Sequence, residues 1–379
     1  MNAEAFDDAA QIGPPEPRRN PRLIGQLAAE TLLAEGFGAS RLAHAWLLTG
    51  PKGIGKATLA YRFARHVLAS SDGNASDGPA LFGAADIPKV APDGEGPLFV
   101  ASDAPIFHRI AAAGHSDLMT VERGLNSTGK RRSDIVVGDV REVNRFFGMT
   151  AGEGGWRVVI IDSADEMNVN AANALLKVLE EPPARALLML VCHNPGRLLP
   201  TIRSRCRKLR LEDLSFDAVS ELLAEYRPDL PEGTRTELAG LSDGSIGRAL
   251  DLAHSDGAEL QRRIMAFLTQ MPTPNIAELQ TFGATMAKAD AAQQFETLSD
   301  LLRRTLARLI RHASGTAIGE NTEETEVFAR LSSAAGLDRW LQVWEKTGDL
   351  LSRTNRINLD RKQVILNIFL NISQTVRGG

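Results

Sequence analysis

A glycine-rich stretch, residues 50–58, carries the residue types best suited to chemistry in this sequence. Its spacing fits the phosphate-loop pattern G-x-x-x-x-G-K-[ST], in which backbone N–H groups and a lysine charge surround a phosphate. The residues that could form such a cradle are Gly50, Gly53, Gly55 and Lys56. The last position of the pattern is altered, because Ala57 stands where a Ser or Thr hydroxyl would hold Mg²⁺. Thr58 lies one residue later, about 100° further round a helix. The stretch therefore predicts a phosphate cradle without its usual metal ligand.

A second candidate is Asp162, which follows the apolar run Val158-Val159-Ile160-Ile161. A β-branched run of this kind is typical of a buried strand in a parallel sheet, and the acid would lie at its carboxyl end. In phosphate-loop proteins an Asp at this place orders the Mg²⁺ ion. The alternative is an Asp that only caps the next turn. The phosphate-loop pattern at residues 50–58 favours the first interpretation.

These candidates need a scaffold of alternating strands and helices. Strand signals lie at residues 45–49, 118–121, 156–162, 187–191 and 208–211, and helical patterns separate them. Such alternation predicts a doubly wound α/β domain with a parallel sheet, ending near residue 212, and the remainder has only helical periodicity. We therefore expect an α/β region followed by an all-α region. The expected parts are a disordered tail (1–21), the α/β domain (22–212) with an irregular insertion (69–105), and two helical domains (213–270 and 271–379).

Composition excludes several classes of protein. The net charge of −4 over 379 residues gives no global basic field, and the sequence has no aromatic stacking pattern and no basic stripe. The basic triplet Lys130-Arg131-Arg132 is interpreted as part of a solvated loop; a phosphate or DNA contact is the alternative. An independent nucleic-acid-binding module is therefore poorly supported.

Two cysteines, Cys192 and Cys206, are too few for a disulfide framework or for a four-cysteine zinc site from this chain alone. No apolar run approaches the roughly 20 residues of a membrane span. The N-terminal residues are acidic and proline-rich, unlike a signal peptide. We expect a cytoplasmic protein without a membrane partner.

Two further motifs give the sequence a family resemblance. Residues 173–183 read Asn-Ala-Leu-Leu-Lys-Val-Leu-Glu-Glu-Pro-Pro, and residues 204–206 read Ser-Arg-Cys. Together with the phosphate-loop stretch and the strand that ends at Asp162, they resemble the clamp-loader branch of the AAA+ ATPases, and within it the non-motor subunits of the bacterial DNA polymerase III clamp loader. The resemblance covers residues 22–255 well and the rest loosely. It implies an AAA+ fold, with residues 213–270 as a lid and residues 271–379 as a collar.

The resemblance also implies partners and two functional arginines. Subunits of this family form a ring that opens a sliding clamp and places it on primed DNA, so the expected partners are motor (gamma/tau-type) and delta-type subunits, the clamp and DNA. Arg205 of the Ser-Arg-Cys motif would reach into the ATP site of the neighbouring subunit, where a guanidinium stabilises charge on the transferring phosphate. The alternative is an arginine that pairs with a nearby carboxylate. Arg248 occupies the position of the lid arginine and would face this chain's own nucleotide pocket.

Several positions depart from the motor subunits of this family. Ser163 follows Asp162, where motors carry the Glu that polarises the attacking water, and a serine cannot act as that base. His193 stands at the polar sensor position, where Asn or Thr is usual. The family's cysteine zinc module is replaced by the 69–105 insertion, which has no cysteine, so we expect no zinc.

The sequence is best interpreted as a non-motor (stator) subunit of a polymerase III holoenzyme. It would bind ATP or ADP weakly or without hydrolysis and supply Arg205 to a neighbour. The alternative is an active AAA+ ATPase, either a clamp-loader motor or a DNA-remodelling enzyme. In that case Thr58 would replace the missing hydroxyl, and Asp165 or Glu166 would act as the base.

Overall fold

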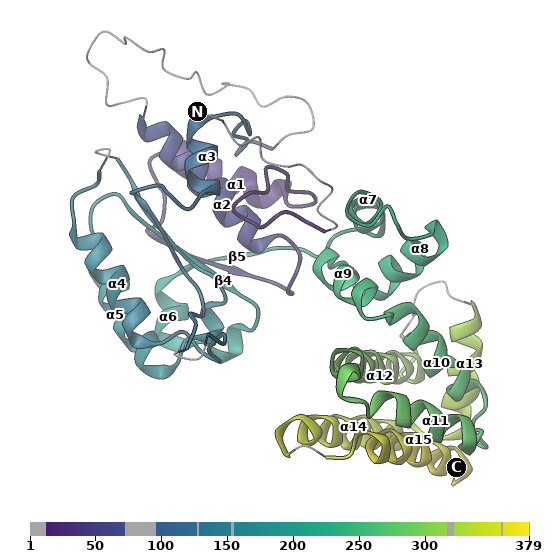
Figure 1. Cartoon of the computed structure of the whole chain (residues 1–379). Coiled ribbons are helices and arrows are strands. Elements are labelled where there is room, and N and C mark those ends of the chain that lie inside the picture. Colours follow the sequence, from purple (N-terminus) through teal and green to yellow (C-terminus); the bar gives the residue numbers. More distant parts are fainter. Residues whose placement is uncertain are drawn as a thin grey trace. The chain divides into compact units, whose positions relative to one another are not determined.

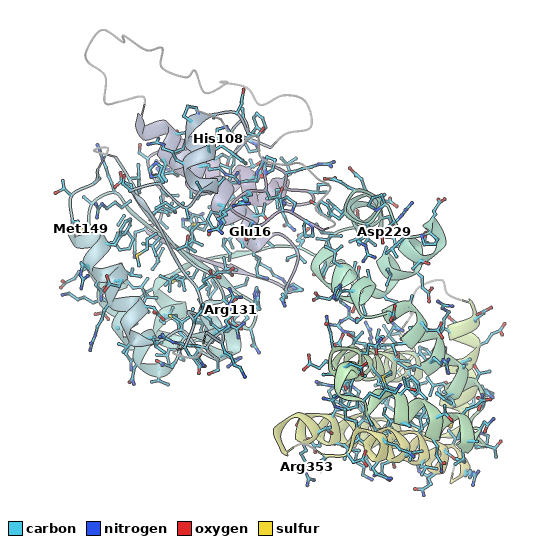
Figure 2. All side chains as sticks on the ribbon, viewed as in Figure 1. Glu16, His108, Arg131, Met149, Asp229 and Arg353 are labelled. Atoms are coloured by element: carbon cyan, nitrogen blue, oxygen red, sulfur yellow. The ribbon has the colours of Figure 1, made fainter. Side chains whose placement is uncertain are left out.

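The computed structural model describes residues 13–72, 96–126, 129–152, 155–316, 322–357 and 359–378 (Figure 1). The chain divides into two compact units. The first comprises residues 1–235 and 242–248, and the second comprises residues 236–241 and 249–379. Each unit is built around its own buried apolar side chains, which are drawn as sticks in Figure 2.

The first unit contains a parallel sheet, as the alternation of strand and helix signals predicted. Its strands are β1 (Ala45–Thr49), β2 (Leu118–Val121), β3 (Arg157–Ile161), β4 (Ala186–Cys192) and β5 (Arg207–Arg210). Their order is β2-β3-β4-β1-β5, so β2 and β5 are the edge strands. In the register of the sheet, Trp46 of β1 lies beside Met189 of β4 and Arg207 of β5. All five predicted strands are confirmed, with ends that differ by at most one residue.

Helices cover both faces of this sheet (Figure 1). They are α1 (Leu27–Gly38), α2 (Lys56–Asp72), α3 (Pro105–Ala111), α4 (Val137–Gly148), α5 (Val169–Glu180) and α6 (Pro200–Arg205), followed by α7 (Phe216–Tyr226). One apolar cluster joins α1, α2 and α3 to the side chains of one sheet face, and a second joins α4, α5 and α6 to those of the other. The predicted doubly wound α/β fold is thus confirmed.

The second unit is entirely helical within the residues that the structure describes. The helices α8 (Glu232–Leu241) and α9 (Ile246–His254) each belong partly to both units. The second unit continues with α10 (Gly257–Thr269), α11 (Ile276–Met286), α12 (Ala292–Ala313), α13 (Thr322–Ala334), α14 (Leu337–Ile357) and α15 (Arg361–Arg377). The expected lid of residues 213–270 is not one unit, because α7 belongs to the first unit and α10 to the second. None of the described helices is both long enough and apolar enough to cross a membrane.

The expected N-terminal tail requires a correction, because residues 13–21 are held against α2. The Arg65 guanidinium donates to the carbonyl of Asn20 (2.8 Å), and Arg62 donates to the carbonyl of Pro21. Arg62 also forms a buried ion pair with Glu30 (2.7 Å). The anchoring arginines lie 45 and 41 residues downstream of the groups they bind, so no local sequence signal announced this contact. Residues 1–12 lie outside the described part of the chain.

The expected irregular insertion is also shorter than its predicted range of 69–105. Helix α2 continues to Asp72, and Leu98 and Val100 are buried in the apolar cluster that contains α2. The sequence did not indicate that Leu98 and Val100 belong to the core, because two apolar residues in a Gly- and Pro-rich stretch form no periodic pattern. The central residues of this range, 73–95, lie outside the described part of the chain.

Candidate nucleotide site and arginine 205

The phosphate-loop stretch joins the buried strand β1 to helix α2, which is the setting that its pattern predicted. Its three glycines, Gly50, Gly53 and Gly55, have φ angles of +140°, +80° and +97°. These angles are readily adopted only without a Cβ atom. The backbone therefore takes a conformation that other residues could not hold without strain, and the chain turns sharply from the sheet into the helix.

Every carbonyl from Gly50 to Ile54 accepts a hydrogen bond. Lys56 Nζ donates to the carbonyls of Gly50 (2.7 Å) and Pro51. Ser245 Oγ donates to the Lys52 carbonyl (2.7 Å), and the Gly247 N–H donates to the Gly53 carbonyl (3.0 Å). The Gln26 amide completes the set with a hydrogen bond to the Ile54 carbonyl (3.3 Å).

The N–H groups of the same stretch have no such partners. Within the described part of the chain, the backbone N–H groups of residues 52–58 donate to no other protein group. Consecutive free N–H groups at the start of a helix form an anion site, since the partial positive charges converge there. The loop thus has its acceptors satisfied internally and its donors available, which fits the polyphosphate of a nucleotide.

The segment Ser245–Arg248 packs directly on the loop, within the same compact unit. A Cβ atom added to Gly53 would lie 2.6 Å from Gly247 Cα, and one added to Gly247 would lie 2.7 Å from Gly53 Cα. Ser245 Oγ also accepts from the Arg248 N–H (3.1 Å). The backbone of Arg248 is therefore fixed beside the loop, close to where the sequence placed a lid arginine, and its facing a nucleotide stays a prediction.

The polar residues at the start of α2 are buried, which changes the pKa of Lys56. Lys56 is only 3% exposed, and burial lowers the pKa of its ammonium group to about 8, while Asp165 and Asp162 favour the charged form. Thr58 is buried next to the fully buried Leu59.

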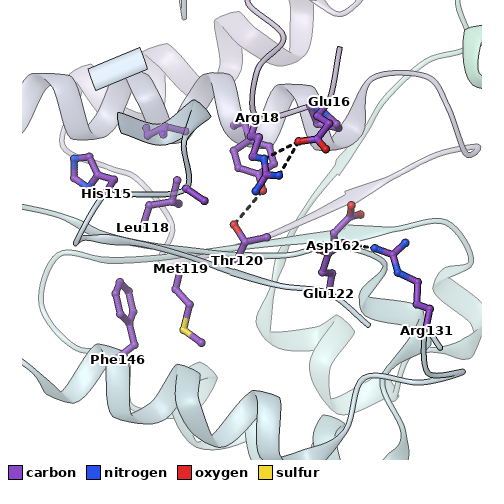
Figure 3. A pocket seen from close by; sticks show the side chains of 14 residues that line it. Glu16, Arg18, His115, Leu118, Met119, Thr120, Glu122, Arg131, Phe146 and Asp162 are labelled. Atoms are coloured by element: carbon purple, nitrogen blue, oxygen red, sulfur yellow. Dashed lines mark hydrogen bonds and ion pairs between the residues drawn. The ribbon is translucent and has the colours of Figure 1, made fainter. Parts of the chain in front are cut away.

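Asp162 follows β3 and its N–H donates to the carbonyl of Val121 (2.9 Å). Burial, with the Glu122 charge as a second cause, raises the pKa of the Asp162 carboxyl. Asp162 and Glu122 line a pocket of about 600 Å³ along β2, whose lining is about half apolar (Figure 3); there Glu122 pairs with Arg131 (2.9 Å) and the Tyr61 hydroxyl is hydrogen-bonded to that of Thr120 (3.0 Å). The Lys56 charge acts in the opposite direction and lowers the pKa of the Asp162 carboxyl, so the two charges interact.

Two of the three altered positions, Ser163 and His193, contact one another. Ser163 Oγ lies 3.3 Å from His193 Nε2, at hydrogen-bonding distance. Burial and, secondarily, the Lys56 charge lower the pKa of His193 to about 4, so the imidazole is neutral at neutral pH. Ser163 has a φ of +60°, which fixes it in a left-handed turn directly after Asp162.

Neither acid proposed as a substitute base has a free carboxylate. Asp165 accepts from the His193 N–H (2.9 Å) through Oδ1 and from the Asn194 N–H (3.1 Å) through Oδ2. Glu166 forms an ion pair with Arg123 (2.8 Å). Asp165 therefore braces the end of β4, a role that the sequence analysis missed and that no local pattern indicated.

Arg205 ends helix α6 and precedes edge strand β5, far along the chain from the phosphate loop. Its Nη2 pairs with Glu180 Oε1 (2.8 Å), and its Nη1 donates to the Thr201 carbonyl (3.1 Å). Its side chain is still 37% exposed. The carboxylate contact that we kept as the alternative is therefore present, and the exposed guanidinium retains further donors.

The basic triplet of residues 130–132 is largely neutralised. Arg131 pairs with Glu122 (2.9 Å) and Arg132 approaches Asp139 (3.9 Å), while Leu125 and Arg131 form an antiparallel bridge. These contacts favour the interpretation of an ordinary solvated loop.

Comparison with known proteins places these features in context. A family model described as "DNA polymerase III, delta subunit" matches residues 101–215. The delta′ subunit of Pseudomonas aeruginosa DNA polymerase III is 38% identical over 62% of this chain and 62% of its own length. The corresponding Bacillus subtilis subunit is 28% identical over 59% of this chain and 58% of its own length. The chain thus spans about six tenths of the length of these two relatives. The Escherichia coli delta′ subunit is 34% identical over 92% of this chain and 94% of its own length.

Proposed function

Because the chain belongs to the family of DNA polymerase III delta′ subunits, we propose that it is a non-motor subunit of a clamp-loader complex. In this role it supplies Arg205 to the nucleotide site of a neighbouring gamma/tau-type subunit and does not itself turn over ATP. Delta-type subunits, the sliding clamp and primed DNA are its further partners in the complex.

The observation that carries this proposal is the division between an intact phosphate cradle and altered catalytic positions. The loop has free N–H groups and a buried lysine, so its residues fit a nucleotide. Ala57 offers no hydroxyl to Mg²⁺, and the position of the water-polarising base holds Ser163, which contacts His193. Each missing group contributes several kcal/mol of transition-state stabilisation in an active ATPase.

The intact cradle and the altered catalytic positions also indicate the cofactor that we propose. ATP or ADP binds through the N–H groups of residues 52–58 and through Lys56, with Arg248 on the same side, and zinc plays no part. A bound nucleotide supplies a polyphosphate for these groups to hold. Asp162 retains the position of a metal-ordering acid, but without the usual hydroxyl partner we expect the nucleotide to bind with weak dependence on Mg²⁺.

Arg205 is suited to act in trans because it is exposed and oriented at the same time. Its contacts with Glu180 and Thr201 use two of the five guanidinium N–H donors, which leaves three for a phosphate. A guanidinium delivered by a neighbour couples hydrolysis to the geometry of a ring.

The decisive experiment compares steady-state ATP hydrolysis by the isolated chain with that of its mixture with gamma/tau-type subunits, clamp and primed DNA. We expect the isolated chain to be silent and the rate of the mixture to fall markedly with Arg205→Ala. Turnover by the isolated chain that Lys56→Ala abolishes would instead establish the alternative, an active ATPase.

A further inference from the structure

The two edges of the parallel sheet differ in charge. Edge strand β5 carries Arg207, Lys208 and Arg210, and charged side chains discourage a further strand from pairing with such an edge. The opposite edge strand, β2 (Leu118–Val121), has no charged residue and no proline. It is short, which limits pairing, but Thr120 is exposed. The edge of β2 therefore lacks the charge that protects the edge of β5.

The backbone of β2 has free hydrogen-bonding groups at this open edge. Toward β3, the Val121 carbonyl accepts from the Asp162 N–H (2.9 Å). Backbone groups of successive residues alternate in direction along a strand, so those of Leu118 and Thr120 face away from β3. The Leu118 N–H donates to the His115 carbonyl (3.3 Å). Within the described part of the chain, the N–H and the carbonyl of Thr120 and the carbonyl of Leu118 have no hydrogen-bond partner.

A groove runs round this open edge (Figure 3). It is the pocket of about 600 Å³ along β2, which we call the β2 edge groove, and side chains from both faces of β2 line it. Leu118 and Thr120 lie on one face with Tyr61, and Met119 lies on the other face with Phe146. A hollow that contacts both faces must pass round the free edge, since the other edge is paired with β3 along its whole length. The groove therefore combines open backbone with apolar side chains on either side of it.

The lining of the β2 edge groove is net negative. Arg18 pairs with Glu16 (2.7 Å). Arg131 pairs with Glu122 (2.9 Å). The Asp162 carboxyl is a third acid in the lining, and it forms no ion pair with an arginine of the described residues. A lysine or arginine of a bound molecule is therefore attracted to the Asp162 end of the groove, whereas an acidic side chain is repelled.

We propose that the β2 edge groove binds an extended, basic segment of another protein, which joins the sheet as an additional strand beside β2. The main chain of this segment pairs with Leu118 and Thr120, and its side chains enter the hollows beside Tyr61 and Phe146, as in other cases of strand addition. A lysine or arginine of the segment lies at the Asp162 end. A second copy of this chain fits less well, because it would bring two net-negative linings together. Neither nucleotide binding nor the proposed function is needed for this interaction.

The test measures, by fluorescence anisotropy, the affinity of the full chain for a labelled peptide Lys-Val-Thr-Val-Thr-Val-Lys at about 50 mM NaCl, where charges are weakly screened. A lysine at each end suits either strand direction. Thr120→Pro removes the free N–H without removing a hydrogen bond to β3, and proline is tolerated on edge strands. We expect this variant to bind the peptide about tenfold more weakly than wild type. The matched control is Thr120→Val, which loses the hydroxyl bonded to Tyr61 but keeps the N–H, and it should bind within about twofold of wild type.

Two further peptides test the same contacts with the wild-type chain. The first carries N-methyl groups on its central residues, which removes the N–H donors that would pair with the carbonyls of Leu118 and Thr120. The second has glutamate in place of both lysines. Each should bind about tenfold more weakly than the lysine peptide. Chemical denaturation shows whether Thr120→Pro is folded, and if it is not, the methylated peptide decides the question.

Equal affinities for the methylated and unmethylated peptides would overturn the proposal, because binding would then not use the main chain. Equal affinities of folded Thr120→Pro and Thr120→Val would do the same. The proposal also fails if the wild-type chain does not bind the lysine peptide at millimolar concentration, or if it binds the glutamate peptide equally well. A homodimer in sedimentation that Thr120→Pro dissociates would assign the groove to a second copy of this chain instead.

Discussion

The phosphate loop and the α6–β5 cationic segment (Arg203, Arg205, Arg207, Lys208 and Arg210) satisfy their polar groups in opposite ways. The loop's carbonyls are hydrogen-bonded within the chain, by the nearby Lys56 and by groups of residues far along the chain. The cationic segment leaves four of its five charges without a carboxylate in the described residues. A region that is complete within one chain can hold a ligand in a fixed geometry, whereas exposed charges without a carboxylate partner stay available for contacts with another molecule. Under the proposed function, the first region binds a nucleotide and the second, through Arg205, acts on the nucleotide of a neighbouring subunit.

The strongest test of this comparison is a pair of variants, at Lys56 and at Arg205, each of which should affect a different assay. Lys56→Ala should weaken nucleotide binding by this chain about 30-fold or more, because a charge-assisted contact to phosphate is lost. It should leave the ATPase rate of the assembled mixture within about twofold. Arg205→Ala should do the reverse and lower that rate by about a hundredfold or more, since arginine fingers contribute 10³–10⁵. Calorimetry and steady-state kinetics measure the two effects; both variants failing in the same assay would contradict the division.

A second prediction concerns the close approach of Gly53 and Gly247. Gly247→Ala places a Cβ 2.7 Å from Gly53 Cα, so we expect a loss of about 2–4 kcal/mol in the free energy of unfolding and weaker nucleotide binding. The control is Gly233→Ala in α8, where a Cβ would meet nothing within 4 Å. That variant should be neutral or slightly more stable, by up to about 1 kcal/mol. Chemical denaturation gives both values. Equal stabilities of the two variants would show that a Cβ at Gly247 does not clash with Gly53, and would contradict the prediction.

The third prediction is a pH dependence of nucleotide affinity. Since burial lowers the pKa of Lys56 to about 8, this side chain loses its charge as the pH rises through that value in the free protein. Affinity for ADP should therefore fall by up to about tenfold per pH unit above this value, and it should be flatter in Lys56→Met. The linked stability has the opposite sign: a lowered lysine pKa means that the unfolded chain binds more protons above pH 8, so this group's contribution to stability rises there. A wild-type profile as flat as that of Lys56→Met would refute the assignment.

The smallest expected effect is a gain of ATPase activity. Ala57→Thr with Ser163→Glu restores the hydroxyl and the acid that motor subunits carry at these positions, and it should give the isolated chain a slow but measurable ATPase activity. The single variants serve as controls, because each lacks one of the two groups. An unchanged rate in the double variant would show that the site is silent for other reasons, of which His193 at the sensor position is the first candidate.

Sequence patterns predicted the local features of this molecule and missed the long-range ones. The strands were found because runs such as residues 158–161 are β-branched and buried, and the loop was found because glycine and lysine spacing reflects backbone chemistry. The partners of the loop carbonyls were not found, since Ser245 lies 193 residues from Lys52. The brace that Asp165 provides and the anchoring of Asn20 by Arg65 were missed for the same reason. Such contacts depend on which surfaces the fold brings together, which periodicity does not encode.

The network of hydrogen bonds on the loop carbonyls has a consequence for what nucleotide binding can signal. A loop that is already ordered gives up little conformational entropy when a ligand enters it, so affinity is not reduced by an ordering step. By the same argument, a ligand can shift an equilibrium only by as much as it distinguishes two conformations. If the chain occupies the place in a clamp-loader complex that we propose, a cradle held in one conformation by its own chain would offer no second conformation to select, and we expect nucleotide binding to carry little information to the neighbouring subunits.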